Sequence, residues 1–194
     1  MYKQCKTQQS SVRQRELELG LLRQLQRRRF DEVSVSDLCL ELNIPRKSFY
    51  RYFASKDGAL FSLLDHAIME FYEEGNFEGL YGGTPQGDLE RFFRFWYQKK
   101  DLLDALRRSN LSGVLVERCT LLASREQLVP SLVQGEEKIR QEAAIAFAVC
   151  GLLAIVFRWR SDGFRTSARE MAEIAVSMLS RPLLPRQEEE TNVQ

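Results

Sequence analysis

The chain has 194 residues, of which 44% are hydrophobic, with 11 glycines and 5 prolines. This length and composition argue for a globular protein with a substantial core, either one large domain or a small domain joined to a medium one. The formal charge at pH 7 is +1, but residues 1–60 hold 12 Lys and Arg against 7 Asp and Glu, and residues 61–194 hold 16 against 20. The basic N-terminal part is therefore the part suited to a polyanionic partner.

Cysteine and histidine usage argues against metal and nucleophile chemistry. The four cysteines are far apart and no pair has CxxC spacing. His66 is the single histidine, whereas most zinc sites and most Ser or Cys nucleophile arrangements need histidine beside other specific groups. We therefore expect no catalytic residue, no metal and no cofactor. The first residues are polar and basic without an apolar signal-peptide run, so we expect a cytoplasmic protein.

Apolar residues recur at three- and four-residue spacing, and no stretch shows sustained strand-like alternation. The sequence therefore predicts an all-α protein of about nine helices. In chain order they cover residues 12–29, with Ser10 or Ser11 as cap, 34–42, 46–53, 56–74, a helix from residue 88, then 101–108, 111–123, 136–161 and 167–180. Residues 75–87, with five glycines and a proline, read as a loop.

A helix-turn-helix is predicted between residues 34 and 53. Ser34 is a suitable N-cap because its hydroxyl can accept from backbone N–H groups that lack partners, and Asp37 is an acid in the first turn. Asn43 tolerates the left-handed conformation that ends a helix, and Pro45 fits the first turn of the next one. The sequence thus places a tight turn between two short helices.

The second of these helices has the residues of a DNA-recognition helix. Arg46, Lys47 and Ser48 lie at its start, where they can enter the major groove, while Phe49 and Phe53 are four residues apart and can pack inward. Two further residues, Tyr50 and Arg51, lie on other faces and suit phosphate oxygens. Lys56 begins the next helix, where free N–H groups already favour an anion.

The segment from Phe30 to Leu60 resembles the DNA-binding domain of the TetR family of bacterial regulators. The matching places are Leu38-Cys39, Leu42-Asn43-Ile44-Pro45, Lys47-Ser48, Tyr50-Arg51-Tyr52-Phe53 and Ser55-Lys56, with Leu60 further on. Pro45 and Lys47 depart from the family pattern, which has a Ser and a Gly or other small residue there. The resemblance implies phosphate contacts from Tyr50 and Lys56, and base or backbone contacts from Ser34, Arg46, Lys47, Ser48 and Arg51.

The resemblance also implies the organisation of the whole chain. We expect a helix-turn-helix domain at residues 1–55, a helical ligand-binding and dimerisation domain at 56–181, and a disordered tail at 182–194. The last two helices are similar to those that form the dimer in family members. The helix at 136–161 carries small residues on one side, and the helix at 167–180 carries apolar residues. Together they predict an interface at Ala144, Ala148, Gly151, Met171, Ala175 and Met178.

The stretch from Ala143 to Phe157 has no charged or strongly polar residue. Because it is shorter than the ~20 residues that cross a bilayer, we expect a helix buried on most sides by protein and no membrane partner. Phe71, Phe92, Trp96, Phe147 and Trp159 are candidates to line a cavity for an apolar or aromatic effector, as the resemblance implies; simple core packing is equally consistent with each of them.

The sequence is consistent with three functions. The favoured one is a homodimeric repressor that binds double-stranded operator DNA and is released by a small apolar or aromatic effector. An alternative is an effector-independent regulator or activator that binds a protein partner through its C-terminal domain. An enzyme is disfavoured by the single histidine and by the absence of a phosphate-binding glycine loop or nucleophile motif.

Overall fold

The computed structural model describes residues 2, 7–73, 84–125 and 138–180. Within these ranges the chain is all-α, as predicted, and its only β pairing is an isolated antiparallel bridge between Tyr2 and Phe53. The helices are α1 (Gln8–Leu25), the 3-10 turn η1 (Phe30–Glu32), α2 (Val35–Glu41), α3 (Arg46–Tyr52), α4 (Lys56–Glu73), α5 (Pro85–Gln98), α6 (Lys100–Arg108), α7 (Ser112–Arg125), α8 (Lys138–Ser161) and α9 (Ala168–Ser180).

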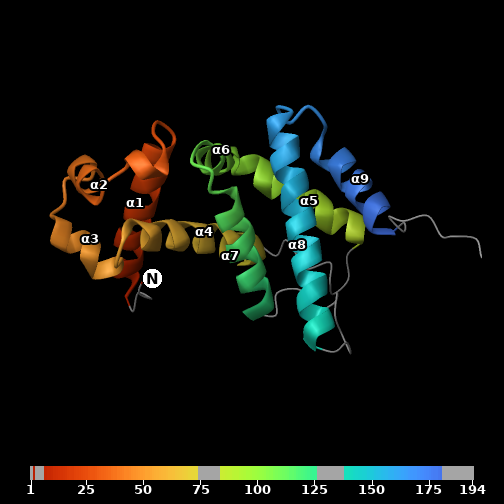
Figure 1. Cartoon of the computed structure of the whole chain (residues 1–194), viewed down its shortest axis with the longest axis horizontal. Coiled ribbons are helices and arrows are strands. Elements are labelled where there is room, and N and C mark those ends of the chain that lie inside the picture. The colour runs from red at the N-terminus through yellow and green to blue at the C-terminus, as the bar shows by residue number, and fades with distance from the viewer. Residues whose placement is uncertain (1, 3–6, 74–83, 126–137, 181–194) are drawn as a thin grey trace, which may run out of the picture.

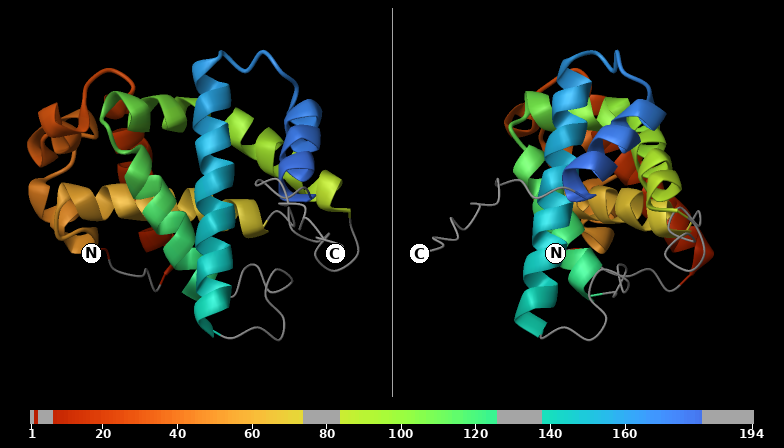
Figure 2. Two further views of the ribbon diagram at one scale, coloured as in Figure 1. Left: turned by 45° about the vertical axis from the view of Figure 1, so that its right-hand side comes forward. Right: turned by 90° about the vertical axis from the view of Figure 1, so that its right-hand side faces the viewer.

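The helices form two groups joined by α4 (Figure 1). We call α1–α3 the head and α5–α9 the body. Along its middle, α4 packs against α1 through Ser62 and His66 and against α7 of the body through Asp65. Helices α8 and α9 lie on the side of the body away from the head in both views (Figures 1 and 2). One continuous hydrophobic cluster extends through head and body.

Local sequence signals explain most helix boundaries. Ser34 caps α2 with a reciprocal capping box, in which its hydroxyl accepts from Asp37 N–H at 3.1 Å and its own N–H donates to the Asp37 carboxylate at 3.1 Å. Asn43 has φ of 50°, the left-handed conformation predicted for the turn. Helix α1 begins earlier than expected, because Thr7 rather than Ser10 or Ser11 accepts as its N-cap, and it ends at Leu25 rather than at residue 29.

A close approach fixes α2 on α1 at Gly20. A Cβ at this position would lie 2.9 Å from a methyl group of Leu42 and 3.0 Å from one of Leu38, both of which are tighter than ordinary contacts. Because glycine has no side chain, Leu38 of α2 and Leu42, which caps this helix, pack directly on the α1 backbone. This contact sets the distance from α1 to the helix-turn-helix.

A buried polar network ties α1 to α4. The Glu18 side chain is fully buried, and its carboxylate accepts from Ser62 Oγ at 2.6 Å and from His66 Nδ1 at 2.7 Å. Gln14 donates to Ser62 Oγ at 2.7 Å. Burial raises the pKa of Glu18, but the hydrogen bonds from His66 and Ser62 outweigh it and the net pKa is lowered. The single histidine therefore has a structural role in joining the two helices.

Helix α8 corrects one expectation from the sequence. It was expected to be buried on most sides, yet only 22% of its most apolar 18-residue window, of mean hydropathy 1.8, is buried. Length and composition alone would allow this helix to cross a membrane, which is weak evidence by itself. Its inner side packs on the body through Ile145, Leu153, Val156 and Trp159. Its outer side is apolar and uncovered in the single chain.

Several sequence predictions fall outside the described residues. They are most of the predicted loop at 75–87, the irregular segment at 124–135 beyond residue 125, and the tail at 182–194. The end of the predicted loop is a helix, because α5 begins at Pro85 with the Thr84 hydroxyl as its N-cap, three residues before the expected start. The domain division at residue 55 remains a prediction.

Candidate DNA-binding site

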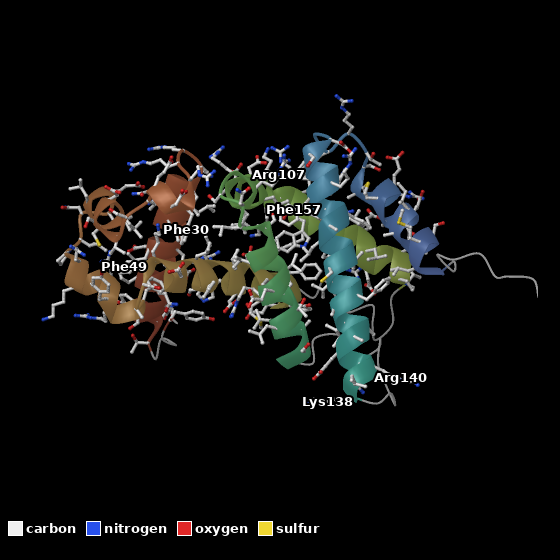
Figure 3. All side chains as sticks on the ribbon, viewed as in Figure 1. Phe30, Phe49, Arg107, Lys138, Arg140 and Phe157 are labelled. Carbon is white, nitrogen blue, oxygen red and sulfur yellow. The ribbon has the colours of Figure 1, made fainter. Side chains whose placement is uncertain are left out.

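The inner side of α3 anchors this short helix to the head. Phe49 and Phe53 are fully buried with ring centroids 5.3 Å apart, as their spacing predicted, and Tyr52 is 8% exposed. Figure 3 shows Phe49 directed into the head. A helix of seven residues has little stability of its own, so these three aromatic side chains hold α3 in place.

The outer side of α3 carries the predicted DNA-contacting side chains. Arg46, Lys47, Tyr50 and Arg51 are exposed, and Ser48 is partly exposed. Arg46 Nη2 lies 3.4 Å from the Tyr50 hydroxyl, which orients both side chains along one edge of the helix. The structure therefore brings three cations and two hydroxyl groups together on one solvent-facing surface, a suitable donor set for phosphate oxygens and base edges.

The remaining two residues predicted to contact DNA, Ser34 and Lys56, differ in how far their side chains are exposed. Ser34 is exposed and caps α2. The Lys56 ammonium is partly buried, donates to the carbonyl oxygens of Phe30 and Val33, the latter at 2.5 Å, and lies 4.3 Å from the Phe30 ring centroid. Lys56 thus ties the start of α4 to the connection between α1 and α2, a structural role that the sequence did not reveal.

The same connection is fixed to the body by α6. Arg108 donates to the carbonyl oxygens of Leu25, at 2.9 Å, and Gln26, the free carbonyls at the end of α1. Ser109 Oγ accepts from Phe30 N–H at 3.0 Å. Phe30 lies on the side of the head that faces α6 (Figure 3). Head and body therefore meet through specific polar contacts as well as through α4.

The structure places four of the five predicted effector residues in one group of aromatic side chains. Phe71 and Phe92 have ring centroids 5.8 Å apart, Phe92 and Trp96 6.4 Å, and Trp159 joins this group through Phe93 at 5.6 Å. Phe147 does not join it. Its side chain is 64% exposed on the outer side of α8, because two residues of helix turn it by about 200° from buried Ile145. We therefore remove Phe147 from the effector site.

The two tryptophans differ in their hydrogen bonds. The indole N–H of Trp159 donates to Thr166 O at 2.9 Å. That of Trp96 is buried and has no partner among the described residues, and a buried donor without an acceptor costs about 1–3 kcal/mol. Within the described part of the chain, the Trp96 indole N–H is therefore a buried donor of the aromatic group that lacks an acceptor.

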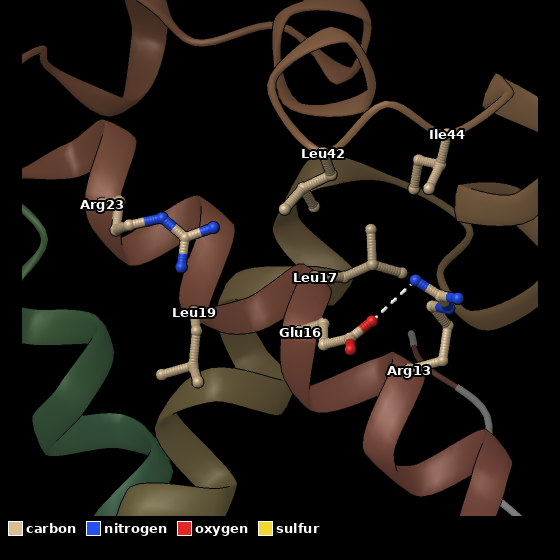
Figure 4. Close-up of a pocket in the computed structure, with 7 residues that line it drawn as sticks. All are labelled: Arg13, Glu16, Leu17, Leu19, Arg23, Leu42 and Ile44. Atoms are coloured by element: carbon tan, nitrogen blue, oxygen red, sulfur yellow. Dashed lines mark hydrogen bonds and ion pairs between the residues drawn. The ribbon is translucent and has the colours of Figure 1, made fainter.

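Two surface hollows lie elsewhere. One, of about 360 Å³, lies on the head beside α1 and is lined by Arg13, Glu16, Leu17, Leu19, Arg23, Leu42 and Ile44 (Figure 4). The other, of about 390 Å³, is lined by Asp104, Arg107, Arg108, Arg160, Ser161 and Gly163. Neither contains a predicted effector residue. No group of three His, Cys, Asp or Glu side chains suited to a metal ion occurs in the described ranges.

The residues predicted to form the dimer interface differ in their exposure in the single chain. Met171 and Ala175 are 8% and 1% exposed, because the inner side of α9 packs on α5 of the same chain, so these two predictions were wrong. Ala144 and Ala148 are partly buried. Gly151 is exposed with open space around it, and Met178 is 51% exposed. The outer sides of α8 and α9 are thus the uncovered apolar surface.

An exposed, cationic recognition helix fixed on a three-helix head defines a helix-turn-helix DNA-binding protein. The family model of bacterial regulatory proteins, tetR family, matches residues 21–62, which include all of α2 and α3. Residues 21–62 are therefore similar to the DNA-binding domain of TetR-family transcription regulators, and regulators of this family act by binding DNA, generally as dimers.

Two solved structures share this fold over most of their length. The dihydroxyacetone kinase operon activator DhaS has a TM-score of 0.58 and 15% identity, covering 88% of this chain and 95% of that one. The fatty acid degradation regulator FadR from Bacillus halodurans has a TM-score of 0.61 and 12% identity, covering 94% and 100%. At these identities the likeness concerns the fold alone. No curated protein matches the sequence.

Proposed function

We propose that the chain is a cytoplasmic, homodimeric repressor whose α3 helices bind successive major grooves of operator DNA and which a small effector releases. The observation that carries DNA binding is the outer side of α3, where Arg46, Lys47, Tyr50 and Arg51 are exposed together. Their cations and hydroxyl groups match phosphate and base-edge acceptors. The operator would be approximately palindromic, with half-sites about one helical turn (~34 Å) apart.

Two substitutions test this assignment. We expect Tyr50→Phe to weaken binding to all duplexes by a similar factor, because it removes a phosphate donor, and Lys47→Ala to reduce the salt dependence and also to alter base preference. Fluorescence anisotropy on a panel of operator variants across a salt series measures both effects. Tyr97→Phe and Lys100→Ala are matched controls, since both residues are exposed on the body. Unchanged binding by Tyr50→Phe and Lys47→Ala would contradict the assignment.

Dimerisation is supported by the uncovered outer sides of α8 and α9. On α8 these residues are Ile139, Ala143, Phe147, Cys150, Gly151 and Ala154, and on α9 they are Ile174, Met178 and Leu179. Exposed apolar residues on two consecutive helices favour pairing with a second copy across a two-fold axis, which gives a four-helix bundle. The interface we propose therefore keeps Gly151 and Met178 of the sequence prediction and adds Phe147.

Effector binding is supported by the Trp96 indole N–H, which lies inside the aromatic group and has no acceptor among the described residues. A flat or apolar molecule against Phe71 and Phe92 that presents one oxygen to Trp96 would supply the missing acceptor. A neutral oxygen fits better than a carboxylate, because burying an ionised group without a countercharge costs far more. Release of DNA follows if the ligand prefers a dimer state whose α3 helices do not match successive grooves.

An indole-detected titration tests the effector site. The chain has two tryptophans, so a ¹H–¹⁵N spectrum contains two indole signals, and that of Trp159, whose N–H already donates to Thr166 O, is the comparison. We expect acetophenone to move the Trp96 signal and to bind about fivefold more tightly than ethylbenzene, which lacks the oxygen, because one hydrogen bond contributes about 1 kcal/mol. Trp96→Phe should remove this preference. Equal affinities for the two probes in the wild type would contradict the assigned role of Trp96.

A further inference from the structure

Tyr2, which precedes α1, contacts the end of the recognition helix. Tyr2 forms the antiparallel bridge with Phe53, the residue that ends α3 and precedes α4. Phe53 is fully buried and its own N–H donates to Phe49 O at 3.1 Å. The backbone at Tyr2 is therefore joined to the point where the orientation of α3 relative to α4 is set.

The side chain of the same residue reaches the middle of α4. The Tyr2 hydroxyl donates to Asp65 Oδ2 at 2.5 Å, and the Asp65 residue is only 3% exposed. A hydrogen bond to a buried carboxylate is among the stronger kinds in proteins. Tyr2 thus contacts both Phe53 and Asp65, which are twelve residues apart in the chain, and holds them in one fixed arrangement.

Asp65 is also the place where the body contacts α4. Arg118 of α7 donates from Nε to Asp65 Oδ1 at 2.7 Å and from Nη2 to Oδ2, and its guanidinium lies 5.5 Å from the Phe61 ring centroid. The hydroxyl of Tyr2 and the guanidinium of Arg118 therefore share one carboxylate oxygen. A shift of α7 along α4 would change the position of that oxygen and hence the support for Tyr2.

We propose that Tyr2 is a positioning residue of the DNA-binding surface: it fixes the end of α3 to α4 and, through Asp65 and Arg118, links the orientation of α3 to the body. This inference rests on the proposed DNA-binding function. Tyr2 touches no base or phosphate in this account. It acts by limiting the orientations of α3, so that fewer unproductive ones compete with binding.

Tyr2→Phe tests the proposal, because it removes the hydroxyl and keeps the ring and the backbone bridge. We expect about tenfold weaker operator binding, consistent with loss of one charge-assisted hydrogen bond, with the slope of log Kd against log salt unchanged because no phosphate contact is lost. Hydrogen exchange of residues 46–53 should become faster, while exchange in α5 and α9 stays the same. Tyr97→Phe, which removes an exposed hydroxyl from the body, is the matched control.

The outcomes separate this inference from the proposed function. Selective wild-type binding together with Tyr2→Phe binding within twofold of it would overturn the positioning role alone. Faster exchange throughout the variant, with a lowered melting temperature, would also overturn it, since the hydroxyl would then act only on global stability. A wild-type chain that binds operator and scrambled duplexes equally would instead contradict the proposed function, whatever the exchange data show.

Discussion

Replacing Phe147 by glutamate is expected to convert the dimer into monomers and to weaken operator binding by about two to three orders of magnitude. Phe147 is the largest exposed apolar side chain on the outer side of α8, at 64% exposure. Its burial in a dimer contributes about 1.5–3 kcal/mol per subunit, whereas a glutamate would place two uncompensated carboxylates in the interface. Loss of the second head then removes the gain from simultaneous binding to two half-sites, about 10²–10⁴-fold.

Sedimentation velocity and DNA anisotropy on the same sample measure this effect. Val12→Glu is the control for an added charge, because Val12 is 55% exposed on α1 and lies far from the outer side of α8 in the sequence and in the fold. A Phe147→Glu chain that remains dimeric would contradict the proposed interface. A wild-type chain that is monomeric would favour the alternative in which this apolar surface binds a different protein.

Replacing Arg118 by methionine is expected to destabilise the fold by about 3–5 kcal/mol, the usual effect of removing one partner from a buried ion pair. The Asp65 side chain is 4% exposed and, among the residues that the structure describes, would keep only the Tyr2 hydroxyl as a donor. The midpoint of urea unfolding should fall accordingly. The double variant Arg118→Met/Asp65→Leu should recover most of the loss, because no unpaired charge then remains buried.

An exposed ion pair provides the comparison. Arg94 pairs with Glu90 on α5 with a side chain 61% exposed, and Arg94→Met should change stability by about 0–1 kcal/mol. If Arg118→Met and Arg94→Met have equal effects, the Asp65 contact does not stabilise the native state as described. If the double variant is less stable than Arg118→Met, the loss is one of packing rather than of charge pairing.

The head was predictable from the sequence because its signals are local. The Ser34 cap, the left-handed Asn43 and the four-residue spacing of Phe49 and Phe53 each depend on residues within one or two turns. The start of α1 was misplaced because Thr7, Ser10 and Ser11 are all capable caps within five residues, and only Thr7 accepts from the helix. When several neighbouring residues can each cap a helix, its first residue cannot be predicted from the sequence to better than one or two positions.

The contacts that join α4 to its neighbours in the head, in the body and before α1 were not predictable, because their partners are distant in the sequence. Tyr2 and Asp65 are 63 residues apart, and Arg118 and Asp65 are 53 apart. The Lys56 ammonium looked free for phosphate, yet it binds carbonyl groups 23 and 26 residues earlier. No periodicity or cap signals such pairs, which arise only when α4 packs between the head and α7.

The sequence also did not determine which side of each of the last two helices packs on the body and which side stays exposed. Helix α8 is apolar nearly all round, so periodicity does not distinguish the side of Ile145 from that of Phe147. In α9 the apolar residues Met171, Ala175 and Met178 suggested one interface, but the packing of α9 on α5 buries the first two and leaves the third exposed. Tertiary contacts decide which side remains for a partner.

The most direct test of the central claim is fluorescence anisotropy of the wild-type protein on duplex DNA from upstream of its own gene, compared with a scrambled duplex, across a salt series. We expect selective binding that weakens steeply as salt rises, because cations of the head displace counterions from phosphates. Equal binding to both duplexes, or no binding even at low salt, would contradict an α3 surface that reads operator DNA.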